Sequence, residues 1–78
     1  MGRYFFDIDD GERRTRDEEG QTLSDLQAAR DEAVRVLPAI ASEVLPDGDH
    51  RELVAVVRSE SGCPVFIATL TLETSFVT

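Results

Sequence analysis

The chain has 78 residues, of which 41% are hydrophobic, and it carries 8 basic and 16 acidic side chains for a net charge of −8. This length allows one domain, residues 1–78, built around a single hydrophobic core. The acidic excess disfavours binding to phosphate backbones and to anionic membrane surfaces, so we expect no nucleic acid partner and no membrane partner.

The first predicted element is a strand over residues 3–8, where side chains alternate between two faces. Tyr4, Phe6 and Ile8 share one face, and Arg3, Phe5 and Asp7 share the other. The dipeptide Asp10-Gly11 predicts a tight turn, after which residues 12–16 return antiparallel to the first strand. This second strand is almost wholly polar, as is typical of a sheet edge, and pairing of Arg14 with Asp7 across the two strands would explain its charges.

A helix is expected at about residues 25–44, because apolar side chains recur there at spacings of three and four. Ser24 can cap its first turn, and Gln27 can reach back to complete the capping arrangement. Pro38 interrupts the pattern, since proline cannot donate a backbone hydrogen bond and crowds the preceding turn. We expect a kink at Pro38 or, as the alternative, two short helices. A turn at residues 46–49 ends this element.

Two further strands are predicted at residues 52–59 and 64–73, joined by a short glycine-containing loop into a second hairpin. In the later strand Phe66, Ala68, Leu70 and Leu72 point to one face, and Val65, Ile67, Thr69 and Thr71 point to the other. In the earlier strand Leu53, Ala55 and Val57 alternate with Val54 and Val56. Both faces of this hairpin therefore carry apolar side chains.

The element order predicts an α+β fold of ββαββ type, with a four-stranded, mainly antiparallel sheet and one helix packed on one face. One helix covers one face, so the opposite face is expected to expose apolar side chains. The predicted interface residues are Phe5, Val54, Val56, Val65 and Ile67. Small soluble monomers rarely expose a large apolar patch, so we expect a homodimer formed through this face or through a strand edge. The alternative is that the two hairpins close on each other.

The acidic segment at residues 7–12 superficially matches a calcium-binding loop, because alternating carboxylates near a glycine can supply oxygen ligands. The spacing departs from that motif, however, and three arginines follow, so the sequence favours a plain hairpin turn and no metal site. The same arginines, Arg13, Arg14 and Arg16, are a weak candidate for an anion contact. Their acidic neighbours favour a self-neutralising edge strand instead.

His50 and Cys63 are the only histidine and the only cysteine of the chain. Neither has a neighbouring group that would activate it, so we predict no catalytic residues, no cofactor and no enzymatic activity. A lone cysteine forms no internal disulfide, and no segment is as long and apolar as a transmembrane helix. A cytoplasmic location is therefore expected.

Four motifs in the first half of the chain carry a family resemblance. They are Arg3-Tyr4-Phe5-Phe6-Asp7, Asp10-Gly11, Asp17-Glu18-Glu19-Gly20, and Leu23-x-Asp25-Leu26-x-Ala28-Ala29-Arg30-x-Glu32-Ala33. Together they resemble the signature of a family of small uncharacterised proteins of rhizobia and related alphaproteobacteria, a domain of unknown function. The resemblance implies a bacterial cytoplasmic protein and supplies no catalytic residues.

A second, looser resemblance is to the partial ribonuclease-H-like half of HicB-type antitoxins. Residues 17–20 and 28–33 are similar to the turn and helix start of that family. Glu19 stands where that family usually has proline, and a hairpin replaces the DNA-binding helical segment. The resemblance implies a toxin-neutralising or similar protein-binding role without operator binding.

The sequence thus predicts a small acidic homodimer that acts as a non-enzymatic interaction or regulatory module and that could bind a basic protein partner. The alternative is an enzyme or ligand-binding site assembled across a dimer from His50, Cys63 and the carboxylates of residues 17–19.

Overall fold

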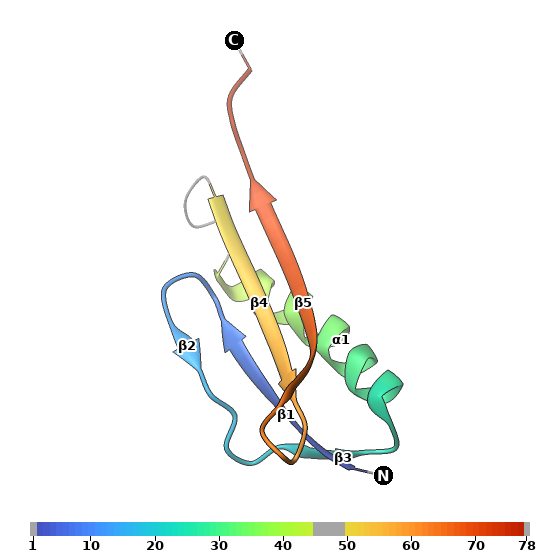
Figure 1. Cartoon of the computed structure of the whole chain (residues 1–78). Helices are drawn as coiled ribbons and strands as arrows, with labels where there is room; N and C mark the ends of the chain where they lie inside the picture. Colours follow the sequence, from blue (N-terminus) through green and yellow to red (C-terminus); the bar gives the residue numbers. More distant parts are fainter. Residues whose placement is uncertain (1, 45–49, 78) are drawn as a thin grey trace.

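The computed structural model of the protein describes residues 2–44 and 50–77. The elements in chain order are β1 (Gly2–Asp9), β2 (Arg14–Thr15), β3 (Gln21–Leu23), α1 (Leu26–Val44), β4 (His50–Arg58) and β5 (Pro64–Glu73). The helix lies against one face of a five-stranded sheet in which every described strand pair is antiparallel (Figure 1). The predicted α+β class is confirmed, with one strand more than expected. The predicted turn at residues 46–49 lies outside the described residues.

The sheet has the order β2-β1-β4-β5, and β3 pairs with the start of β1. In register, Phe6 lies opposite Val57, and Val57 lies opposite Phe66. A register shift between Val57 and Arg58 adds one residue to β5 near its start. The two long strands β4 and β5 form the second predicted hairpin, and β5 ends the sheet.

The second predicted strand is wrong in extent. Only Arg14 and Thr15 form strand β2, opposite Asp9 and Ile8, and the chain returns to β1 as β3 after a turn at residues 17–20. The two pieces are one return strand that this turn interrupts. The predicted pairing of Arg14 with Asp7 is also wrong, because Arg14 lies opposite Asp9 and its guanidinium is 3.6 Å from the Asp9 carboxylate.

The core lies between α1 and the sheet. Its buried members are Ala29, Ala33, Leu37 and Ala41 of the helix and Leu53, Ala55 and Val57 of β4. Tyr4, Phe6 and Ile8 pack against them from β1, and Phe66, Ala68 and Leu70 do so from β5. The predicted division of each strand into two faces is therefore confirmed. Alanines on the helix let it approach the sheet closely, so larger side chains on the strands fill the core.

The helix begins one residue later than predicted, and its cap is Asp25 rather than Ser24. The Asp25 carboxylate accepts the backbone N–H of Ala28 at 2.9 Å, and the Asp25 carbonyl accepts the N–H of Ala29 at 3.2 Å. Both serine and aspartate are good caps, so the sequence did not separate them. Gln27 donates instead to Asp31 at 3.1 Å, one turn further along the helix.

Replacing Asp25 with alanine should lower the free energy of unfolding by about 1 kcal/mol, because it leaves the Ala28 N–H without its side-chain acceptor. Ser24→Ala, at the neighbouring exposed position, should leave the stability nearly unchanged. Urea unfolding followed by circular dichroism measures both variants. Equal losses for the two substitutions would show that Asp25 is not the effective cap.

Pro38 lies on the exposed side of α1, and the helix runs from Leu26 to Val44 without interruption. The alternative of two short helices is therefore excluded. Within the described residues, no helix has the length and apolar character needed to cross a membrane.

Candidate functional site

The face of the sheet away from α1 is called here the open sheet face. It carries all five predicted interface residues, because Phe5, Val54, Val56, Val65 and Ile67 alternate with side chains that point to the helix. Val65 and Ile67 are 39% and 61% exposed, whereas Phe5, Val54 and Val56 are half-buried. The most exposed apolar part of this face therefore belongs to β5.

An ion pair between Asp7 of β1 and Arg58 of β4 occupies the middle of the open sheet face. Arg58 donates from Nε to Asp7 Oδ2 at 2.6 Å and from Nη2 to Asp7 Oδ1 at 3.1 Å, which is a bidentate arrangement. Its Nη2 also donates to the Asp17 carbonyl at 2.8 Å, and its guanidinium lies 5.0 Å from the centre of the Phe5 ring. Only 8% of Arg58 is exposed, so most of this charge is removed from water.

Asp17 connects this pair to the interrupted return strand. Its Oδ2 accepts the N–H of Phe6 at 3.1 Å, and its Oδ1 accepts the N–H groups of Glu19 and Gly20, both at 3.1 Å. Its own N–H donates to Asp7 Oδ1 at 2.9 Å. The Asp17 side chain thus replaces the backbone ladder where the return strand is interrupted, and it holds the 17–20 turn against β1.

Gly20 permits the Phe5 ring to pack under this turn. Its φ of +73° lies in the left-handed region, and a Cβ atom built on it would stand 2.9 Å from the Phe5 ring and 3.0 Å from the Tyr4 carbonyl oxygen. Any side chain here would meet both an unfavourable backbone conformation and a steric clash. The sequence Asp17-x-x-Gly20 is therefore required by packing.

Hydrogen bonding holds the pKa values of both carboxyl groups below their ordinary value of 3.8. For Asp7, the bond from Arg58 is the main cause of the lowered pKa. For Asp17, burial is the largest single influence and raises the pKa, but the three backbone N–H donors together outweigh it. Both groups are thus ionised at neutral pH and act as acceptors in the fold.

The lowered pKa values predict a specific acid sensitivity. Each carboxylate stabilises the fold fully above its unfolded pKa near 3.8, and this contribution is lost as the pH falls through the lower folded pKa. The urea midpoint should thus stay nearly constant from pH 7 to about pH 5 and fall steeply between about pH 4 and pH 2. Asp7→Asn should flatten that fall, and an equally steep fall in this variant would contradict the assignment.

A shallow hollow of ≈ 270 Å³ lies beside the ion pair, between β1, β4 and the start of β5. It is lined by Asp7, Ile8, Asp9, Arg14, Val54, Val56, Arg58 and Pro64. Of the three arginines predicted as an anion contact, Arg14 lines the hollow, and all three are exposed. Asp7 and Asp9 lie at the same place, so the hollow carries both signs of charge.

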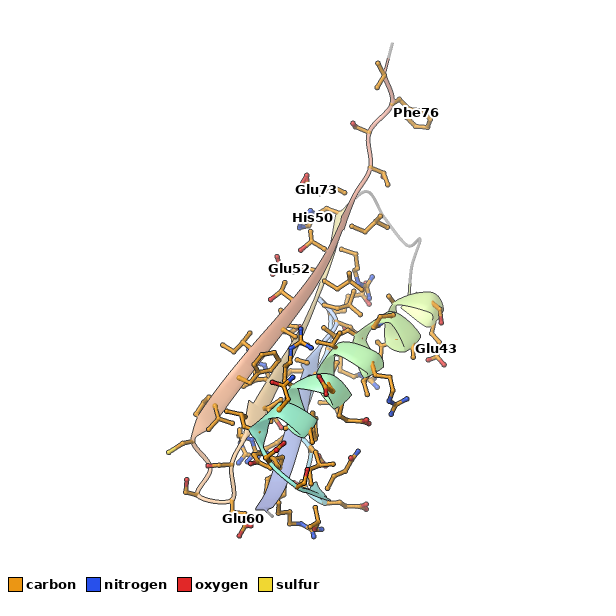
Figure 2. The ribbon with its side chains drawn as sticks, turned by 90° about the vertical axis from the view of Figure 1, so that its right-hand side faces the viewer. Glu43, His50, Glu52, Glu60, Glu73 and Phe76 are labelled. Carbon is orange, nitrogen blue, oxygen red and sulfur yellow. The ribbon has the colours of Figure 1, made fainter. Side chains whose placement is uncertain are left out.

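The structure does not bring His50, Cys63 and the Asp17–Glu19 carboxylates together within one chain. His50 begins β4 and lies 3.5 Å from Glu73 at the end of β5, whereas the exposed Cys63 precedes β5 at the other end of the hairpin. Figure 2 shows His50 and Glu73 together, far from Glu60 at the hairpin tip. Both carboxylate oxygens of Asp17 already accept the backbone hydrogen bonds described above.

The acidic segment at residues 7–12 forms a turn whose carboxylates accept backbone N–H groups. Asp9 Oδ1 accepts from Gly11 at 2.9 Å, and Asp10 Oδ1 accepts from Glu12 at 3.0 Å and from Arg13 at 2.8 Å. Gly11 has a φ of +95°, as the predicted Asp-Gly turn requires. Arg51 of β4 donates from Nε to the Asp10 carbonyl at 2.5 Å and joins the turn to the sheet.

Sequence reasoning missed Arg58, which is the centre of the polar network. One signal was present, because Arg58 follows Val54 and Val56 in the alternation that points to the open sheet face. Asp7 follows Phe5 in the same alternation of β1, and Phe5 lies opposite Arg58 in register. Opposite charges on the same face of two predicted strands are a signal of a possible pair.

Comparison with known proteins places the chain in a family. No curated protein and no solved structure matches it. A family model described as a domain of unknown function, DUF6894, matches residues 3–71, which include the helix and all or most of each described strand. The matched range contains the Asp7, Asp17, Gly20 and Arg58 network and the whole of the residue pattern found in the first half of the sequence. The chain therefore belongs to the DUF6894 family of domains of unknown function.

Proposed function

We propose that this domain is a non-enzymatic protein-interaction module that acts as a homodimer in the bacterial cytoplasm and binds another protein through its open sheet face. The observation that carries the proposal is the uncovered apolar strip on β5, where Ile67 is 61% and Val65 is 39% exposed. The single helix packs on the opposite face, and none of the described elements covers this strip.

The polar network supports a binding role over a chemical one. Both oxygens of Asp7 and both oxygens of Asp17 accept hydrogen bonds from the protein itself. A group that serves as acid, base or nucleophile needs to reach a substrate atom, and these carboxylates are instead occupied in holding strands together. They make the open sheet face rigid, which lowers the entropic cost of binding.

The net charge of −8 favours a basic partner. The acidic side chains of Glu52 and Glu73 are both exposed and are seen near His50 at the far end of the β4–β5 hairpin (Figure 2). A basic protein lying along the strip would meet apolar side chains at its centre and carboxylates at its rim, as protein interfaces commonly do.

The test combines light scattering with partner capture. The purified domain should have the mass of a dimer, and a partner recovered from the native host should be lost when Ile67 is replaced by aspartate. Thr22→Asp, at an exposed position of β3, serves as the control and should retain the partner. A strict monomer that recovers no partner would overturn the proposal.

A further inference from the structure

The outer edge of β5 is a long sheet edge that no other described strand covers. β5 has ten residues and pairs with β4 alone. Residues 64–72 include no charged side chain, and their one proline, Pro64, stands at the first position. Natural sheet edges usually carry charges, prolines or a covering segment, because a bare edge is a template for pairing with another strand.

The direction of the backbone groups along β5 follows from the alternation of antiparallel ladders. Phe6 sends its N–H to Asp17, away from β4, so Phe6 and its partner Val57 form a pair without mutual hydrogen bonds. Val57 then bonds on its other side, to Phe66. The direction alternates along β5, so the backbone groups of every second residue bond to β4; these residues are Phe66, Ala68 and Leu70. The N–H and C=O groups of the residues between and after them point to the uncovered edge; these residues are Ile67, Thr69 and Thr71.

The helix supplies a second observation at the same edge. Leu26 falls in the same inward stripe as the buried Ala29, Ala33 and Leu37, yet it is 44% exposed. The first turn is the end of α1 that lies toward β5 (Figure 1). An inward-facing apolar side chain is therefore left partly uncovered on the β5 side.

Val34, which is 43% exposed, lies on the flank of α1 that faces this edge. Glu32 marks the opposite flank, which faces β3, because its carboxylate accepts a hydrogen bond from the Gln21 side chain of β3 at 3.5 Å. Residues 32 and 34 differ by two positions, or about 200° around a helix. Val34 thus projects toward the β5 side, where an added strand would lie under both it and Leu26.

We infer that β5 pairs antiparallel with β5 of a second copy, so that two sheets join into one continuous sheet with both helices on the same face. This inference rests on the proposed homodimer and names the surface that forms it. Charge favours a second copy as the occupant, because residues 64–72 let two chains of net charge −8 meet without opposing like charges.

A two-fold axis at Ala68 gives the best register. It places Ile67 opposite Thr69 and Val65 opposite Thr71 on the open sheet face, and it pairs Phe66 with Leu70 beneath the helices. An axis one residue later would place the Glu73 carboxylate opposite Val65. Ala68 itself would form a pair without mutual hydrogen bonds, where Cα atoms approach to about 4.5 Å and small side chains fit best.

The same register would bring the C-terminal segment, residues 74–77, against the second copy. Residues 74–77 continue from β5, and Phe76 and Val77 are 99% and 96% exposed in the single chain. Figure 2 shows Phe76 projecting beyond the sheet. In the dimer this segment would run beside the hairpin turn of the partner, at residues 59–62, and its aromatic ring would leave water.

The first test removes one outward N–H donor from each copy, and therefore two hydrogen bonds across the proposed interface. Thr69→Pro deletes an N–H that points outward and leaves the bonds between β4 and β5 intact, so the variant should be a folded monomer by light scattering and circular dichroism. Thr69→Ala keeps the N–H and should remain a dimer. A dimer of undiminished affinity in Thr69→Pro would overturn the pairing.

The second test uses disulfide formation in a Cys63→Ser background and remains decisive if Thr69→Pro fails to fold. Ala68→Cys places one thiol on the two-fold axis, and a mild oxidant should convert most of the protein to a dimer that dithiothreitol reverses. Thr71→Cys on the same strand is the control, because two copies of residue 71 would lie about 20 Å apart in this register.

The outcomes separate the two proposals. A monomeric wild-type chain would overturn both the homodimer and the edge pairing. A wild-type dimer in which Ala68→Cys crosslinks no better than Thr71→Cys would overturn the edge pairing alone and would leave the homodimer to another surface, such as the open sheet face.

Discussion

Asp7→Ala is expected to destabilise the folded protein by about 3 kcal/mol, because removing one partner of a largely buried ion pair leaves the other charge uncompensated. Arg58 would lose its bidentate acceptor, and the Asp17 N–H would lose its only side-chain acceptor in the network. A core of this size typically supplies about 3–5 kcal/mol in total. The variant should therefore retain at most about 2 kcal/mol of stability at 25 °C.

Urea unfolding at fixed protein concentration, followed by circular dichroism, measures this loss. Asp7→Asn keeps the shape and one acceptor oxygen and should lose less stability than Asp7→Ala. Arg14→Ala is the matched control, because the Arg14 side chain is 78% exposed and its ion pair with Asp9 is solvated. If Asp7→Ala and Arg14→Ala were equally stable, the Asp7–Arg58 pair would contribute nothing to the fold.

Gly20→Ala should also cost about 3 kcal/mol, from the left-handed backbone conformation and the overpacking of a new methyl group. The added Cβ would stand 2.9 Å from the Phe5 ring and 3.0 Å from the Tyr4 carbonyl oxygen. The Tyr4 oxygen belongs to β1 and cannot move without disturbing the sheet. The ring would have to shift, and the contact between Phe5 and Arg58 would be lost with it.

Gly62→Ala separates the cost of the left-handed backbone conformation from the cost of overpacking. Gly62 has a φ of +89°, and a Cβ atom there would have no neighbour within 4 Å. This control should lose only the conformational part, about 1 kcal/mol. Thermal unfolding of Gly20→Ala and Gly62→Ala under the same conditions gives the difference in melting temperature, which reports the overpacking. Equal melting temperatures would show that the Phe5 packing tolerates the methyl group.

The sequence predicted most of the architecture because hydrophobic alternation is a local signal. The two faces of β1, β4 and β5 follow from period-two patterns, and the helix follows from apolar residues at spacings of three and four. Strand β3 was missed because Gln21 and Thr22 are polar and follow a glycine, which locally indicates a loop. It is a strand only because the Asp17 side chain holds the preceding turn against β1, which is a tertiary effect.

The polar network was less accessible to sequence reasoning. Asp7 and Arg58 are separated by 51 positions, and their pairing requires the antiparallel register of β1 and β4. Such a register is long-range geometry, which local patterns do not contain.

The other side of β1 decides how far assembly through β5 can proceed. β2 pairs with Ile8 and Asp9, the Asp17 carboxylate accepts the Phe6 N–H, and β3 pairs with residues 2–4, so the outer side of β1 is covered along its length. Each chain therefore has one long uncovered edge, that of β5. In the proposed dimer, joining two such edges about a two-fold axis would use both of them, so growth would stop at two copies and would not continue into fibres.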